Sequence, residues 1–166
     1  MEYLVNDLQE EQKKAAYQAD PLTHDIESIL PYRSRYMGDA SNLINLFQAL
    51  PLQQASPTFE LKPDTFTAEV SYRVSAGSLV KEQTARALLY NATAAFALID
   101  NLKVLEFQLE NSPAYRIERA ELEHWYGKDW QGLLDAGHWK DHVQAKLADP
   151  SYVSRFEGKV LSPIAA

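Results

Sequence analysis

The sequence predicts an α+β fold: a two-layer sandwich in which a long central helix packs on a small, mostly antiparallel sheet. Three observations predict it. An alanine-rich apolar stripe with helical spacing runs through residues 79–100, segments of alternating apolar and polar residues lie on both sides of it, and helical patterns occupy both ends of the chain. Because alanine permits a helix to approach a sheet closely, we expect the helix over 79–100 to form the centre of the core.

The central helix is predicted from apolar residues that recur at spacings of three and four. These residues are Ala85, Leu88, Leu89, Ala92, Ala95, Phe96 and Ile99. Polar residues lie away from this stripe, namely Gln83, Arg86, Thr93 and Asp100. We therefore expect an amphipathic helix with one buried face, for which Ser78 is a plausible N-cap.

Alternating patterns predict a pair of strands on each side of this helix. Residues 59–62 and 66–74 alternate on either side of a Pro63-Asp64 turn. The resulting hairpin has one wet face, which carries Glu69, Ser71 and Arg73. After the helix, a strand is predicted over 103–110, and another begins at Tyr115.

The two ends of the chain are predicted to be helical. Residues 2–19 form a helix that Asp20-Pro21 ends, because proline disfavours the helical conformation of the residue before it. Residues 21–37 show no clear period and are predicted to be irregular. A helix over 120–126 stops at Gly127, and two or three short helices follow, with breaks near Gly137 and Pro150.

The domain organisation follows from this order of elements. An N-terminal helical arm spans 1–20, an α+β core spans 21–128, and a helical C-terminal extension over 129–166 packs on the core. We expect these parts to form a single domain, because 166 residues is an ordinary length for one domain.

The segment RYMGDASNLINLF, residues 35–47, admits two interpretations. It is either a ligand-gripping loop or the start of a helix. Gly38 suits a turn with positive φ, and Asp39 is a preferred N-cap residue. Apolar residues then fall on one helical face until Pro51 stops the helix. We favour the helix start and keep a binding loop at the same helix N-terminus as the alternative.

Composition excludes several classes of function. The formal net charge is −7 and no Lys/Arg cluster is present, so the chain is not expected to bind nucleic acid. The absence of cysteine excludes disulfides, thiolate zinc sites and thiol nucleophiles. No apolar run approaches the roughly 20 residues of a membrane-spanning helix. The N-terminal residues lack the pattern of a signal peptide.

Three segments resemble a bacterial extracytoplasmic domain of unknown function. They are RYMGDASNLINLFQALPL, FELKPDTFTAEVSYRV and ALLYNATAAFALIDNLKVLEFQLE, and the resemblance covers about residues 30–128. That domain occurs in Gram-positive secreted lipoproteins and attached to sensor-type membrane metallopeptidases. Its characteristic positions include Tyr36, Gly38 and Asp39 at a helix entry, Leu50-Pro51 at the helix exit, and FALIDN running into a strand.

The resemblance implies a location and no activity. It implies an extracytoplasmic protein, membrane-anchored or secreted, with a membrane or envelope protein as the expected partner. The sequence departs from this pattern because it shows no signal peptide and no lipobox cysteine. The expected location therefore assumes that a leader has been removed. Any association with the membrane is expected only through a leader or anchor that is absent from this chain.

Six aromatic residues, including all three tryptophans, lie in the last 42 residues. Two explanations stand: the short helices pack on the core through these side chains, or the side chains form a partly exposed groove that binds a peptide, glycan or lipid. The candidate binding residues are Trp125, Tyr126, Trp130 and Trp139.

Metal chemistry provides the alternative function. His138 and His142 are four residues apart, so on a helix both would face one side, as two metal ligands can, with Asp135 or Asp141 adding an oxygen. A third nitrogen is not evident, and no Glu occupies the general-base position of an HExxH motif. Acidic residues within RIERAELEH could form a carboxylate pair for acid/base work. We favour a solvated helix start, where the helix dipole favours acids, because Leu122, Trp125 and Tyr126 form an inward stripe.

These observations lead to one favoured function and two alternatives. We expect a non-enzymatic cell-envelope binding or sensory domain of unknown ligand, with no catalytic residues and no cofactor. The first alternative is a small metal-dependent hydrolase that uses His138 and His142. The second is a structural subunit of a membrane complex.

Overall fold

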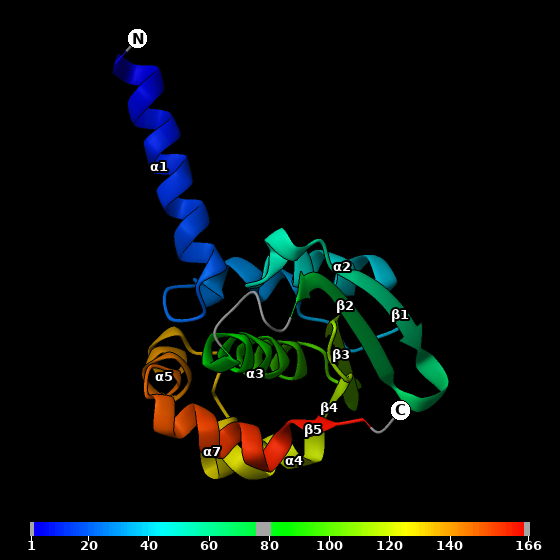
Figure 1. Cartoon of the computed structure of the whole chain (residues 1–166). Helices are drawn as coiled ribbons and strands as arrows, with labels where there is room; N and C mark the ends of the chain where they lie inside the picture. The colour runs from blue at the N-terminus through cyan, green and yellow to red at the C-terminus, as the bar shows by residue number, and fades with distance from the viewer. Residues whose placement is uncertain (1, 76–80, 165–166) are drawn as a thin grey trace.

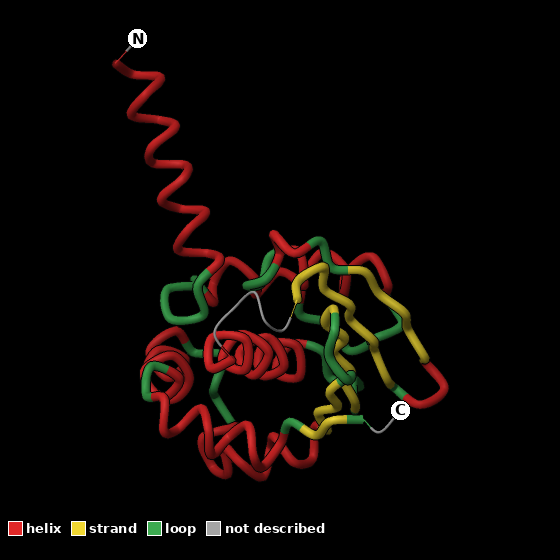
Figure 2. The backbone as a smooth tube through the Cα atoms, in the orientation of Figure 1, coloured by secondary structure: helices red, strands yellow, loops and turns green. Residues whose placement is uncertain are grey.

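The structure, a computed structural model, describes residues 2–75 and 81–164 and confirms the α+β class (Figures 1 and 2). The described residues form helices and a five-stranded sheet with the strand order β1-β2-β3-β4-β5. The predicted N-cap at Ser78 and the predicted first residues of the central helix lie outside the described residues. None of the described helices is long and apolar enough to cross a membrane.

The sheet is mixed. Its strands are β1 Thr58–Lys62, β2 Thr67–Ser75, β3 Val104–Glu110, β4 Tyr115–Glu118 and β5 Ser162–Pro163. The pairs β1–β2, β3–β4 and β4–β5 are antiparallel, as a mostly antiparallel sheet requires, and β2 and β3 are parallel. The parallel pair arises because the helix α3 (Lys81–Leu98) connects these two strands. The sequence did not predict β5, since two residues show no alternation.

Alternation along the strands separates a buried face from an open one, as predicted. On β2, Ala68, Val70 and Tyr72 are buried, whereas Glu69 points to the opposite face and is partly exposed. The β1–β2 connection is a short 3-10 turn over Pro63–Thr65. Phe66, which follows it, adopts a φ of +52°.

The central helix α3 is buried on more than one side. All seven residues of the predicted stripe are buried, which confirms it. The expected polar face is wrong only in part: Gln83 and Asp100 are exposed, whereas Thr93 is buried, as are Thr84 and Asn91. The reason is visible in Figure 1: the sheet lies on one side of α3 and the C-terminal helices lie on another.

Hydrogen bonds compensate for some of these buried polar groups. The Asn91 amide donates to the carbonyl of Pro51 at 2.8 Å and to the Tyr72 hydroxyl at 3.1 Å. Thr93 donates to the carbonyl of Leu89, as a helical threonine can, and its hydroxyl lies 3.0 Å from the hydroxyl of Tyr126.

The C-terminal helices belong to the same hydrophobic core as the sheet. Their bounds are α4 Arg119–Tyr126, α5 Ala136–Trp139, α6 Ala145–Leu147 and α7 Pro150–Val160, with a 3-10 turn (η4) over Gly127–Trp130 and a π-helical turn (η5) over Lys140–Gln144. Buried side chains from them include Leu122, Trp139, Val143 and Phe156.

The predicted helix boundaries in this region are confirmed, although one break lies a few residues earlier than Gly137. Gly127, with a φ of +60°, ends α4, and Pro150 begins α7. The break expected near Gly137 lies just before it, over residues 131–135, and Asp135 then caps α5 by accepting hydrogen bonds from the backbone of Gly137 and His138. The chain turns earlier, at Gly132, where φ is +77°.

The N-terminal third starts with a projecting helix. The helix α1 (Glu2–Ala19) extends away from the body (Figure 1), and residues 5–17 are exposed. The irregular segment predicted over 21–37 is wrong in part, since a 3-10 helix (η1) spans Ile26–Tyr32.

The helix entry in RYMGDASNLINLF is confirmed. The helix α2 spans Ala40–Gln48, and the carboxylate of Asp39 accepts a hydrogen bond from the backbone N–H of Asn42 at 3.2 Å. The positive φ expected at Gly38 is wrong, because among the described glycines only Gly127 and Gly132 adopt one.

Candidate functional site

Two of the four predicted binding residues lie in the interior. Trp139 is fully buried, and its indole N–H donates to the hydroxyl of Tyr90 at 3.1 Å. The two rings are in edge contact, with centroids 5.4 Å apart. Tyr126 is buried as well and is hydrogen bonded to Thr93. These two side chains hold the C-terminal helices on α3, so in this structure a ligand at the surface would not contact them.

Trp125 and Trp130 are half-buried and lie in different hollows of the surface. Trp125 lines a hollow of about 640 Å³ between α4 and α7, which we call the α4–α7 hollow. It is lined by Ala120, Glu121, His124, Trp125, Lys159 and Val160. Trp130 lines a separate hollow of about 600 Å³ with Leu30 and Arg33. The structure therefore does not bring the four predicted residues into one groove.

The two candidate metal ligands do lie side by side. The ring centroids of His138 and His142 are 5.6 Å apart. His138 Nδ1 is 3.2 Å from the carbonyl of Gly132, and His142 Nδ1 is 3.6 Å from a carboxylate oxygen of Asp129. Over residues 2–75 and 81–164, no group of three or more His, Cys, Asp or Glu side chains is placed to hold a metal ion. A catalytic zinc site takes three protein ligands, so these residues do not complete one.

The predicted carboxylate pair is dispersed. Glu118 accepts hydrogen bonds from Arg116, and Glu123 forms an ion pair with Arg119 at 3.2 Å. Glu121 is exposed and faces the α4–α7 hollow instead. Each acidic side chain thus has a different environment, and no two of them share a site.

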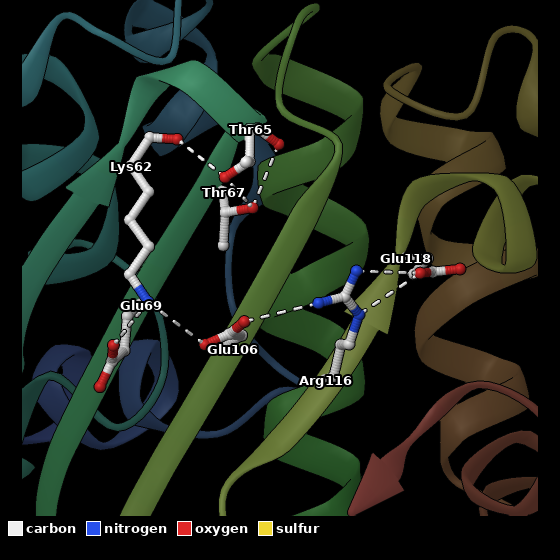
Figure 3. Close-up of polar contacts among 7 residues, drawn as sticks. All are labelled: Lys62, Thr65, Thr67, Glu69, Glu106, Arg116 and Glu118. Atoms are coloured by element: carbon white, nitrogen blue, oxygen red, sulfur yellow. Dashed lines mark hydrogen bonds and ion pairs between the residues drawn. The ribbon is translucent and has the colours of Figure 1, made fainter. Parts of the chain in front are cut away.

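The outer face of the sheet is a second candidate surface. Strand register places four charged residues in one row across adjacent strands, which we call the outer row: Glu60 on β1, Glu69 on β2, Glu106 on β3 and Arg116 on β4. Figure 3 shows three of these side chains on the face of the sheet. They are partly or fully exposed, so none of the described elements covers the outer row.

Ion pairs connect the outer row with its neighbours (Figure 3). The Lys62 ammonium lies 3.6 Å from Glu69 and 3.9 Å from Glu106. On the other side, the Arg116 guanidinium lies 3.6 Å from Glu106 and 3.1 Å from Glu118. Glu60 forms no hydrogen bond or ion pair within the described part of the chain. Exposed pairs of this kind each contribute about 0–1 kcal/mol, so the network adds little to stability.

A third polar cluster is buried, and the sequence offered no signal for it. The Tyr90 hydroxyl lies 2.6 Å from His24 Nδ1, and His24 Nε2 lies 2.8 Å from the carbonyl of Ala49. Since a carbonyl only accepts, Nε2 carries the proton and donates, and Nδ1 accepts from Tyr90. Tyr90 in turn accepts from Trp139. Every donor in this series of hydrogen bonds has an acceptor, and the series requires a neutral His24.

This cluster predicts that stability depends on pH. Burial lowers the pKa of His24 below 6.5, and this effect outweighs the hydrogen bond to Ala49 and the charge of Asp25, which raise the pKa. The unfolded chain then binds a proton at a higher pH than the folded chain. We therefore expect the free energy of unfolding to be constant with respect to His24 above pH 6.5 and to fall as the pH decreases below it.

The measurement is urea unfolding of the wild type and of His24→Asn between pH 7.5 and pH 5. Asparagine keeps a hydrogen-bond acceptor close to the position of Nδ1 and does not titrate. The difference in unfolding free energy between the two proteins should shrink as the pH falls. A difference that is independent of pH would contradict the assignment of His24 as a buried neutral base.

The comparisons with known proteins identify a family. A family model described as a domain of unknown function (DUF4825) matches residues 29–120, which is more than half of the chain. The matched region contains α2, α3 and strands β1 to β4, and it ends at the start of α4. No curated protein and no solved structure matches the chain. The resemblance to a domain of unknown function is thereby confirmed, whereas its cellular location stays a prediction.

Proposed function

Because this chain belongs to the DUF4825 family, we propose that it is a non-enzymatic binding domain of the cell envelope that docks a basic protein partner on the outer face of its sheet. The family match covers the four strands that carry the outer row. What supports the envelope location is the resemblance of the sequence to extracytoplasmic domains.

One observation carries the proposal: glutamates stand directly opposite one another on adjacent strands of an uncovered face. Glu60 is opposite Glu69, and Glu69 is opposite Glu106. Like charges in this position destabilise a sheet. Lys62 and Arg116 offset this repulsion at Glu69 and Glu106, whereas Glu60 forms no ion pair within the described part of the chain. The stability of the sheet therefore does not explain the unpaired charge of Glu60 opposite Glu69, whereas a positively charged partner would.

The charge of the whole face agrees with a basic partner. Five glutamates and three basic residues point outward from strands β1 to β4: Glu60, Glu69, Glu106, Glu110, Glu118, Lys62, Arg73 and Arg116. Polar residues without charge, including Ser71 and Gln108, occupy the positions between them. Such a face would attract a basic surface over a distance of about a Debye length and align it along the row.

The test combines a binding measurement with a stability measurement on the same substitution. Glu60→Gln removes a charge that faces Glu69 and has no described partner of its own. We expect it to weaken binding of a nine-residue polylysine peptide about threefold, or about 0.7 kcal/mol, and the double substitution Glu60→Gln/Glu69→Gln to weaken it about tenfold. Stability of the single variant should stay the same or rise by up to about 0.5 kcal/mol.

Calorimetry gives the affinities, and backbone amide shifts in NMR spectra locate the peptide. The matched control is Glu27→Gln, an exposed glutamate of η1 outside the sheet. Shifts centred on residues 60, 69 and 106 are expected. Shifts spread evenly over the acidic surface, or equal losses in the control, would refute docking on this face.

A photo-crosslinking residue at position 71 then tests for the natural partner in the producing cell. The same residue at position 48, which is exposed on α2, is the control position. We expect a crosslinked partner from position 71 that disappears in the Glu60→Lys/Glu69→Lys variant. Identical products from both positions would contradict the proposal.

A further inference from the structure

We propose that the α4–α7 hollow is a separate binding site for a saccharide, with Trp125 as the platform for one face of a sugar ring. The hollow lies between two helices, and the outer row lies on the sheet, so the two sites are independent. Three observations support the proposal: the contacts that hold Trp125, the polar groups that surround it, and the lack of described hydrogen-bond or ion-pair partners for those groups.

Trp125 is held rigidly from behind. Its ring stacks on Phe156, with centroids 4.8 Å apart and planes 11° from parallel. Its indole N–H donates to the Tyr152 hydroxyl at 2.8 Å, and the two rings are in edge contact. The part of the indole that these contacts leave free lines the hollow. An aromatic surface fixed before binding loses little conformational entropy when a ligand settles on it.

The polar groups around the platform complement hydroxyls. Glu121 and His124 extend from α4, and Lys159 extends from α7 on the other side of the hollow. An ionised carboxylate only accepts hydrogen bonds, an ammonium only donates them, and a neutral imidazole does both. A sugar hydroxyl also donates and accepts, and the C–H groups of a sugar ring form an apolar face. One apolar wall with a few converging polar groups is the usual composition of a small-molecule site.

These polar groups have no partners of their own. Within the described part of the chain, Glu121, His124 and Lys159 form no hydrogen bond or ion pair, although all three line one hollow of about 640 Å³. Their hydrogen-bonding capacity is therefore available to a ligand. A lipid chain would need a continuous apolar wall, which three polar side chains interrupt here.

The experiment titrates the whole protein with two oligosaccharides, an N-acetylglucosamine tetramer and maltotetraose, and follows amide and indole signals by NMR and affinities by calorimetry. For at least one of them we expect shifts confined to residues 120–125 and 159–160 and to the Trp125 indole. Glu121→Ala and Lys159→Ala should each weaken binding about fivefold, which is the loss of one or two hydrogen bonds. Both residues are exposed, so these variants should fold normally.

Two controls separate this site from other surfaces. Lys146→Ala removes an exposed lysine of α6, and Trp130→Phe alters the half-buried tryptophan of the other hollow. Neither should change the affinity for the saccharide. The proposal is overturned if neither oligosaccharide shifts these residues, if Glu121→Ala and Lys159→Ala bind as the wild type does, or if dipeptides bind the hollow and saccharides do not.

Discussion

Trp139→Ala is expected to lower the free energy of unfolding by about 4 kcal/mol, the range for removing a large aromatic side chain from a packed core. The reason is complete burial together with a specific contact: the ring meets Tyr90 edge-on, and its N–H donates to the Tyr90 hydroxyl. Trp139→Phe keeps an aromatic ring and loses the donor, so a smaller loss of about 1–2 kcal/mol is expected.

Urea unfolding followed by circular dichroism measures these losses. The matched control is Trp130→Ala, which removes a tryptophan that is only half-buried, and a loss of about 1–2 kcal/mol is expected from the smaller apolar area. If Trp139→Ala cost no more than the control, the C-terminal helices would not be anchored on α3 as described.

Arg119→Ala is expected to lower the free energy of unfolding by about 3 kcal/mol. The Arg119 guanidinium donates to three carbonyls at or just beyond the end of α3. Its Nε donates to Leu102 at 2.6 Å, and one terminal nitrogen donates to Phe96 at 2.7 Å and to Ile99 at 2.5 Å. A positive charge at the C-terminal end of a helix also complements the helix dipole. Removing the side chain leaves these partly buried acceptors without their donor.

Two comparisons test this assignment. Arg119→Lys should recover only a minor part of the loss, because a single ammonium cannot reproduce the planar fork that reaches three carbonyls. Arg116→Ala removes an arginine three residues earlier that is itself exposed and whose partners are partly exposed glutamates, and a loss below about 1 kcal/mol is expected. Equal losses for Arg119→Ala and Arg116→Ala would show that capping of α3 contributes nothing.

The role of Arg119 could not be predicted from its neighbours in sequence. Glu118, Glu121 and Glu123 surround it, which suggests ion pairs within one solvated helix, and one such pair with Glu123 does form. The three carbonyls that bind its side chain belong to residues 96–102. They come within reach only because β3 pairs with β4, which places the start of α4 beside the end of α3.

The candidate sites, too, could be predicted from the sequence only in part. Strand alternation predicted a wet face bearing Glu69, and this face carries the outer row. Alternation alone could not predict that Glu60, Glu69 and Glu106 would be neighbours, because the register between strands was unknown. Aromatic clustering indicated Trp125, whereas Lys159, on the other wall of its hollow, had no signal in the sequence.

The sequence by itself determined most of the helices and strands, the cap at Asp39, the stop at Gly127 and the α+β class. Each depends on the periodicity of a short segment or on the conformational preference of one residue. Only the tertiary structure decided that Thr93 and Trp139 are buried, that His24 meets Tyr90, and that the outer row crosses four strands. Burial and pairing depend on contacts between segments that are distant in the chain, and local sequence patterns do not predict those contacts.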